Sequence, residues 1–333
     1  MHRFYCDCGQ EIFLESTICV NCRRPVAYFP IRNTMVTLEQ KDGDWCVAGE
    51  EVSVQWCTHR LQYEVCNSVL HHQEDSTYCV ICRLNRTVPN LNNPRNLTRW
   101  AKLEEAKRRL LFGLLALGLP LEVPVDGGIY RLGFDFLEDK RTNPSVPDEF
   151  ITTGHQQGII TVNVLEADDV QRVWQREQSG ERYRTLLGHL RHEVGHFYFE
   201  LLATDRTKFQ ALFGAETQDY DDALRAYYLH GAKPDWEQHY ISAYASVHPK
   251  EDWAECFAHY LHMLDTLQTA AARDLIEPFS GGESAQQLLQ IWDALSVTLN
   301  ELNRSLGMPD AYPFVVNAEV ANKLEYIHQA IQG

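Results

Sequence analysis

The chain has 333 residues, with 46 acidic side chains against 30 basic ones and a formal charge of −16 at pH 7. This length suits about two domains, and the negative charge argues against nucleic acid or an anionic membrane as a partner. No segment has the length and apolarity of a membrane span, and the start Met-His-Arg-Phe-Tyr-Cys lacks the pattern of a signal peptide, so we expect a cytoplasmic protein.

Nine of the ten cysteines precede residue 83, which in a chain without an export signal indicates metal binding rather than disulfides. They contain two groups of four, each of which predicts a tetrahedral structural zinc site. The first group is Cys6, Cys8, Cys19 and Cys22, and the second is Cys57, Cys66, Cys79 and Cys82. Cys46 and Cys256 are left over and are expected to be small buried side chains.

A breaker-rich stretch at residues 89–96, Pro-Asn-Leu-Asn-Asn-Pro-Arg-Asn, predicts a domain boundary. The two domains are then a cysteine-rich module at residues 1–88 and a second domain at residues 97–333. Apolar spacing predicts a helix at residues 97–117, with the basic run at residues 107–109 on its solvated face.

Residues 129–137 and 158–165 are expected to be β-strands, because they are rich in β-branched and aromatic side chains. Apolar periodicity then predicts helices through the rest of the chain. After residue 210 these helices are expected at residues 219–230, 235–246, 249–271, 284–306 and 317–331. The sequence therefore predicts an α+β fold in which the second domain is mainly helical with a small sheet.

The segment from Arg191 to His196 has the pattern H-E-x-x-H. Apolar residues recur at helical spacing from Tyr183 onward, so the pattern is expected on a helix, where positions four apart share a face. His192 and His196 can then reach one metal ion, and Glu193 is placed to take a proton from metal-activated water, as in zinc hydrolases. The open alternative is a histidine-rich amphipathic helix without a metal.

A third ligand is expected, because catalytic zinc usually takes three protein groups and a water. A second helix is predicted to begin at Pro249, and it places Glu251 and Glu255 four residues apart on one face. One carboxylate, Glu251, is predicted to bind the metal, and Glu255 is predicted to orient a ligating histidine. Asp252 is the alternative third ligand, and Cys46 is an alternative inhibitory ligand. Glu251 and Asp252 lie in the first turn of this helix, where acidic side chains interact favourably with the helix dipole without any metal.

H-E-x-x-H followed by a helix with E-x-x-x-E resembles the glutamate-zincin (gluzincin) metallopeptidases, and the stretch from Tyr244 to Phe257 is similar to the corresponding region of anthrax lethal factor. More closely, the whole chain resembles a bacterial family of zinc-binding metallopeptidases with an N-terminal zinc ribbon. The segments that carry this resemblance are Cys79–Pro89, Thr153–Asn163, Arg191–His196 and Ile241–His262.

The resemblance implies a double zinc ribbon followed by a zincin-type domain that hydrolyses peptide bonds. It also implies that Tyr244, seven residues before Glu251, donates a hydrogen bond to the developing oxyanion, with His239 or His248 next in line. Residues 154–163 would form the rim strand that pairs with an extended substrate.

We therefore expect three zinc ions, one catalytic and two structural, and a peptide or protein substrate. A protein partner on the ribbons is possible within this scheme. Two other functions stay open: a non-catalytic adaptor that binds proteins through its ribbons and keeps a structural metal site, and a zinc amidase.

Overall fold

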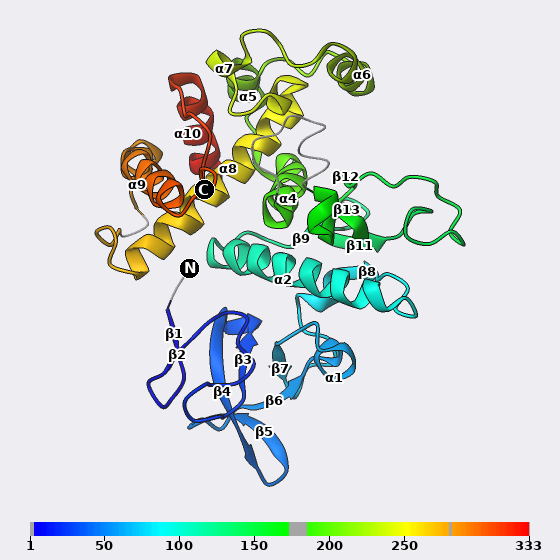
Figure 1. Ribbon diagram of the computed structural model, residues 1–333, viewed down its shortest axis with the longest axis vertical. Helices are drawn as coiled ribbons and strands as arrows, with labels where there is room; N and C mark the ends of the chain where they lie inside the picture. Colours follow the sequence, from blue (N-terminus) through cyan, green and yellow to red (C-terminus); the bar gives the residue numbers. More distant parts are fainter. Residues whose placement is uncertain (1–2, 173–184, 280–281, 333) are drawn as a thin grey trace. The chain divides into compact units, whose positions relative to one another are not determined.

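The computed structural model describes residues 3–172, 185–279 and 282–332. The chain divides into an N-terminal unit that ends at Gln171 and a C-terminal unit that begins at Arg172. The predicted α+β class is confirmed, because all the described strands lie in the first unit and the described part of the second is helical (Figure 1). The predicted linker at residues 89–96 lies inside the N-terminal unit, and the division into domains at 1–88 and 97–333 stays a prediction.

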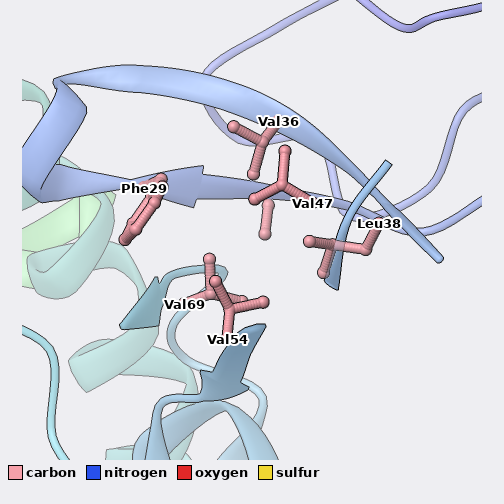
Figure 2. Packing of buried hydrophobic residues seen from close by; sticks show 7 residues of the cluster. Phe29, Val36, Leu38, Val47, Val54 and Val69 are labelled. Atoms are coloured by element: carbon pink, nitrogen blue, oxygen red, sulfur yellow. The ribbon is translucent and has the colours of Figure 1, made fainter. Parts of the chain in front are cut away.

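The first part of the N-terminal unit is a five-stranded antiparallel sheet with the order β3-β4-β5-β6-β7. Its strands are β3 (Val26–Phe29), β4 (Thr34–Lys41), β5 (Asp44–Val47), β6 (Ser53–Trp56) and β7 (Val69–His71), and the hairpin β1 (Phe4–Tyr5) and β2 (Glu11–Ile12) precedes them. Alternate side chains of a strand point to one face, so every strand adds apolar groups to one core. Figure 2 shows this core of Phe29, Val36, Leu38, Val47, Val54 and Val69.

Helix α2 (Pro94–Ala116) begins three residues before the predicted start at residue 97. Asn93 caps it, since its side chain accepts a hydrogen bond from the Arg95 N–H at 3.2 Å, and Pro94 takes the first helical position that proline favours. The solvated face predicted for residues 107–109 is wrong for two of the three side chains. Lys107 is buried with its Nζ 2.9 Å from Oε1 of Glu104, and Arg108 is buried and donates a hydrogen bond to the carbonyl oxygen of Val65 at 2.9 Å. Shorter helical segments in this unit are η1 (Pro30–Arg32), α1 (Thr58–Tyr63) and η2 (Cys82–Leu84).

A four-stranded sheet with the order β12-β13-β11-β8 completes the unit. Its strands are β8 (Asn85–Thr87), β11 (Gly133–Leu137), β12 (Gly154–Gln156) and β13 (Ile159–Asn163), parallel except for β12. Residues 154–163 thus form a hairpin, whose turn has positive φ at Gln157 (50°) and Gly158 (86°). Strand β12 forms one edge of the sheet and β8 the other. The substrate-pairing role of residues 154–163 stays a prediction.

The single strand predicted at residues 129–137 is wrong. Residues 128–131 form β10 (Gly128–Arg131), whose one partner among the described strands is β9 (Glu122–Val125), and β11 begins separately at Gly133 in the other sheet. A Cβ at Gly133 would lie 2.9 Å from Cδ1 of Ile159, so the chain enters this sheet at a residue without a side chain. The strand predicted at 158–165 ends at Asn163, where η3 (Val164–Ala167) begins.

The C-terminal unit is built around α8 (Pro249–Ala272), against which α4, α5, α9 and α10 pack (Figure 1). The other elements are α4 (Leu186–Leu202), α5 (Arg206–Phe213), α6 (Tyr220–His230), α7 (Trp236–His239), η4 (Tyr244–Ser246), α9 (Ala285–Ser305) and α10 (Ala318–Gln332). Helices α6, α8, α9 and α10 confirm four of the predicted ranges, whereas α5 was not predicted. Tyr183 lies outside the described residues.

The helix predicted at residues 235–246 is wrong, because only α7 and the short η4 are helical there. The backbone of Tyr240 is extended, which ends α7. Further on, the hydroxyl of Ser242 accepts a hydrogen bond from the Ala245 N–H at 3.1 Å, so this N–H bonds to a side chain and not to a helical carbonyl group. Within the described ranges, no helix is both long enough and apolar enough to cross a bilayer.

Candidate metal centre

Helices α4 and α8 approach closely at one glycine. A Cβ at Gly195 would lie 2.9 Å from Cα and 3.0 Å from O of Ala254. Trp253, the residue before Ala254, is buried, and its Nε1–H donates to the carbonyl oxygen of Gly195 at 2.8 Å. Because glycine has no side chain, the two helices can approach closely here, and the hydrogen bond from Trp253 holds them together.

This contact brings together three side chains of the predicted centre. The Nε2 atoms of His192 and His196 lie 3.2 Å apart. Oε2 of Glu251 lies 3.0 Å from Nε2 of His192, and Oε1 lies 3.3 Å from Nε2 of His196. The three residues offer ligand atoms that all lie within 4.8 Å of one another. The structure therefore gathers His192, His196 and Glu251 as the sequence predicts.

Glu255, one turn further along α8, contacts the ring nitrogen of His192 that does not face Glu251. Its Oε1 lies 2.6 Å from Nδ1 of His192, and its Oε2 accepts a hydrogen bond from the hydroxyl of Ser242 at 2.5 Å. Burial would raise the pKa of Glu255, but the contact with His192 outweighs it and lowers the pKa to about 2. A carboxylate on Nδ1 places the N–H there and leaves the lone pair of Nε2 for a metal.

The donor set fits a divalent cation. Within the described residues, Oε2 of Glu251 is buried and accepts no hydrogen bond, although it lies 3.0 Å from Nε2 of His192. Burial would lower the pKa of His192, but the carboxylates of Glu251 and Glu255 raise it well above its usual range. The site thus favours positive charge, and two imidazoles with a carboxylate are a common set for catalytic zinc.

Glu193 lies beside the three donors and is buried. Oε1 of Glu193 lies 3.3 Å from Nε2 of His189, one turn earlier on α4. Burial would raise the pKa of Glu193, but His189 and the two neighbouring histidines lower it. A carboxylate at this position is ionised at neutral pH and can accept a proton.

Two tyrosines line the centre. The ring of Tyr244 lies 5.8 Å from the ring of His192, centroid to centroid. Tyr220, at the start of α6, donates a hydrogen bond from its hydroxyl to Oε1 of Glu251 at 2.6 Å. Burial and the nearby Glu251 carboxylate raise the pKa of both phenols, so both keep their protons at neutral pH. Sequence reasoning did not identify Tyr220, since nothing in its spacing connects it with Glu251.

Asp252, the alternative third ligand, lies on the other side of α8. Its Oδ2 accepts a hydrogen bond from Nζ of Lys323 on α10 at 2.6 Å, and both side chains are buried. Lys323 also donates to the backbone oxygen of His239 at 2.7 Å. Burial raises the pKa of Asp252 to about 7 although Lys323 lowers it, so this carboxylate depends on the lysine. Glu251, not Asp252, is the acid that meets the histidines.

The other candidate donors are engaged elsewhere. His248 caps α8, with Nδ1 accepting from the Lys250 N–H at 3.2 Å and Nε2 lying 3.3 Å from the carbonyl oxygen of Gln218. The exposed His239 has its Nδ1 2.8 Å from Oε2 of Glu319.

Each of the ten cysteines, all within the described ranges, is a thiol. The predicted groups assemble as two tetrads, with all four sulfurs of each within 4.8 Å of one another. Within the first tetrad, Cys6 and Cys22 lie 3.5 Å apart. In the second, Cys66 and Cys79 lie 3.9 Å apart. Cys46 is buried outside both tetrads, with its Sγ 3.9 Å from Oγ of Ser53.

The chain is similar to known proteins over nearly all of its length. Proteins of Mycobacterium tuberculosis and Mycobacterium bovis, both named as uncharacterized, are 36% identical to the chain over 343 residues, which covers 99% of this chain and 95% of theirs. No solved structure gives a significant match. Residues 3–93 match a zinc-ribbon domain family, and residues 96–330 match the family described as "Putative zinc-binding metallo-peptidase". The chain therefore belongs to this family of zinc-binding metallopeptidases and carries its zinc ribbon at the N-terminal end.

Proposed function

We propose that the protein is a zinc-dependent peptidase in which His192, His196 and Glu251 hold the metal. The observation that carries the proposal is the convergence of these three donors across the α4–α8 contact. The buried carboxylate of Glu193 belongs with them, because His192 and His196 help to lower its pKa. A structural zinc site would leave no role for Glu193, which is buried, ionised and adjacent to the donors.

When bound, zinc supplies a Lewis acid that lowers the pKa of a water molecule and polarises the carbonyl group of the substrate. Glu193 accepts a proton from the attacking water and returns it to the nitrogen of the leaving amine. Glu255 keeps His192 in the tautomer that presents Nε2, and Ser242 holds Glu255 in place. Tyr244 donates a hydrogen bond from its phenol to the carbonyl oxygen as negative charge develops there.

The two cysteine tetrads would hold two structural zinc ions, and the total would be three. Ten thiols suit a reducing compartment, which favours the cytoplasm. A peptide or protein is the substrate in this proposal, and the ribbons are a surface for a protein partner.

Changing Glu193 to Gln tests the proposal, because it removes the base and keeps the size of the side chain. We expect the variant to keep three zinc ions and lose about 10²- to 10⁴-fold in rate. In a lysate of the cells that produce the protein, new peptide termini should appear with the wild type and not with E193Q. Glu200→Gln, on the exposed side of the same helix, is the matched control and should cleave like the wild type. Equal cleavage by E193Q, or no cleavage by a wild type that holds three zinc ions, would refute the proposal.

Changing Tyr244 to Phe should leave the fold and the zinc content intact and lower kcat by about 10²-fold, with little change in KM. The reason is that the phenol would meet the carbonyl oxygen only in the transition state. Steady-state kinetics on a peptide found in the lysate comparison would measure this. If the variant cleaved at the wild-type rate, Tyr244 would be a packing residue and another donor would serve the oxyanion.

A further inference from the structure

Tyr220 approaches the metal centre from a helix that carries none of the predicted ligands. It is the first residue of α6 and lies 31 residues before Glu251 in the sequence. Its hydroxyl donates to Oε1 of Glu251 at 2.6 Å, which is a short hydrogen bond between a phenol and a buried carboxylate.

The start of α6 is held in this position by His248. Nδ1 of His248 accepts a hydrogen bond from the backbone of Lys250, so the proton of the neutral ring is on Nε2 and is donated to the carbonyl oxygen of Gln218. The ring of Tyr220 also lies edge-on against the ring of His248, with centroids 5.4 Å apart. His248, which caps α8, therefore also holds the ring of Tyr220 in the position from which its hydroxyl reaches Glu251.

The hydrogen bond makes the two oxygens of Glu251 unequal. Oε1 accepts the hydrogen bond from Tyr220. Oε2 is buried, accepts no hydrogen bond from any residue that the structure describes, and lies 3.0 Å from Nε2 of His192. An oxygen that already accepts a strong hydrogen bond is a poorer metal donor than one that does not. Oε2 is therefore the better ligand, although Oε1 lies within 3.3 Å of His196.

We propose that Tyr220 is a positioning residue that makes Glu251 bind the metal through Oε2 alone. A carboxylate that bound through both oxygens would occupy the position that catalytic zinc keeps for water and substrate. By holding Oε1 aside, Tyr220 keeps this position open and also fixes the rotamer of Glu251. The inference rests on the proposed metal centre, but it does not depend on which bond the protein cleaves.

The change of Tyr220 to Phe tests this inference in the full-length protein with both cysteine tetrads loaded. Loss of a hydrogen bond to a metal ligand typically lowers metal affinity about 10- to 100-fold, and we expect that loss for zinc at this centre in competition with a chelator. Tyr228→Phe is the matched control on the same helix, where the side chain is 73% exposed, and it should bind zinc like the wild type. Thermal unfolding of the metal-depleted proteins would check that both variants fold.

A spectroscopic measurement distinguishes positioning from a loss of general stability. With cobalt(II) in place of zinc at this centre, Tyr220→Phe should weaken the visible absorption bands, because a carboxylate released to bind through both oxygens raises the coordination number. Unchanged zinc affinity and an unchanged cobalt spectrum would overturn the inference while leaving the peptidase proposal intact. A wild type that binds a third zinc but cleaves nothing would refute the peptidase proposal alone, and one that binds only two zinc ions would refute both.

Discussion

Changing Gly195 to alanine is expected to destabilise the protein, although the same change at an ordinary helical position would stabilise it. Alanine favours a helix over glycine by about 1 kcal/mol. At Gly195, however, the new Cβ would lie 2.9 Å from the backbone of Ala254, which cannot rotate away as a side chain could. Overpacking of this kind costs about 1–3 kcal/mol, so after the gain in helix propensity we expect a net loss of up to about 2 kcal/mol.

The same substitution should also lower the affinity of the metal centre for zinc. His192 and His196 lie on one side of the contact and Glu251 on the other, so helices forced apart would separate the donors and lower zinc affinity. Urea unfolding and chelator competition measure the two effects. Glu200→Ala, on the exposed side of α4, is the control and should leave both unchanged. A more stable Gly195→Ala protein with full zinc affinity would show that the helices can separate without cost.

Changing Cys79 to Ser is expected to remove one zinc ion and unfold part of the N-terminal unit. Cys79 is buried within the second tetrad, where structural zinc typically contributes about 10–16 kcal/mol of binding free energy. That is comparable with the whole stability of a domain, about 5–15 kcal/mol. Elemental analysis should fall from three zinc ions per chain to two, and proteases should cut the variant within residues 3–171.

Cys46→Ser is the matched control for this experiment, because Cys46 is buried nearby in sequence but belongs to neither tetrad. It should keep all the zinc. If Cys79→Ser also kept three zinc ions and resisted proteases, the tetrad would be a cluster of buried thiols without a metal. If instead the Cys46 variant lost zinc or cleaved peptides faster, the alternative of Cys46 as an inhibitory ligand would have to be taken up again.

The sequence alone predicted those parts of the site in which the residues lie on the same helix. Spacing of four residues predicted that His192 and His196 share a face, and that Glu251 and Glu255 share another. The structure has these pairs on α4 and α8, and it adds that Glu255 meets His192. Helical periodicity predicted both helices for the same reason, since it is a local property of the chain.

The parts that were missed depend on pairs of residues far apart in the sequence. Tyr220 and Glu251 are 31 residues apart, and Asp252 and Lys323 are 71 residues apart, so no local pattern connects them. The strand predicted at residues 129–137 failed similarly, because its two halves pair with different partners. Which strand or side chain becomes a neighbour is decided by tertiary packing.

The ion pair between Lys323 and Asp252 also affects the order in which the protein matures during translation. Asp252 leaves the ribosome 71 residues before its partner, and in that interval the start of α8 cannot bury an uncompensated carboxylate without a large desolvation cost. Glu251 is the adjacent residue, so its final placement also waits for α10. The cysteine tetrads are complete after residue 82 and can take their zinc long before then. A nascent chain would therefore be folded at its start before the three donors of the metal centre have come together.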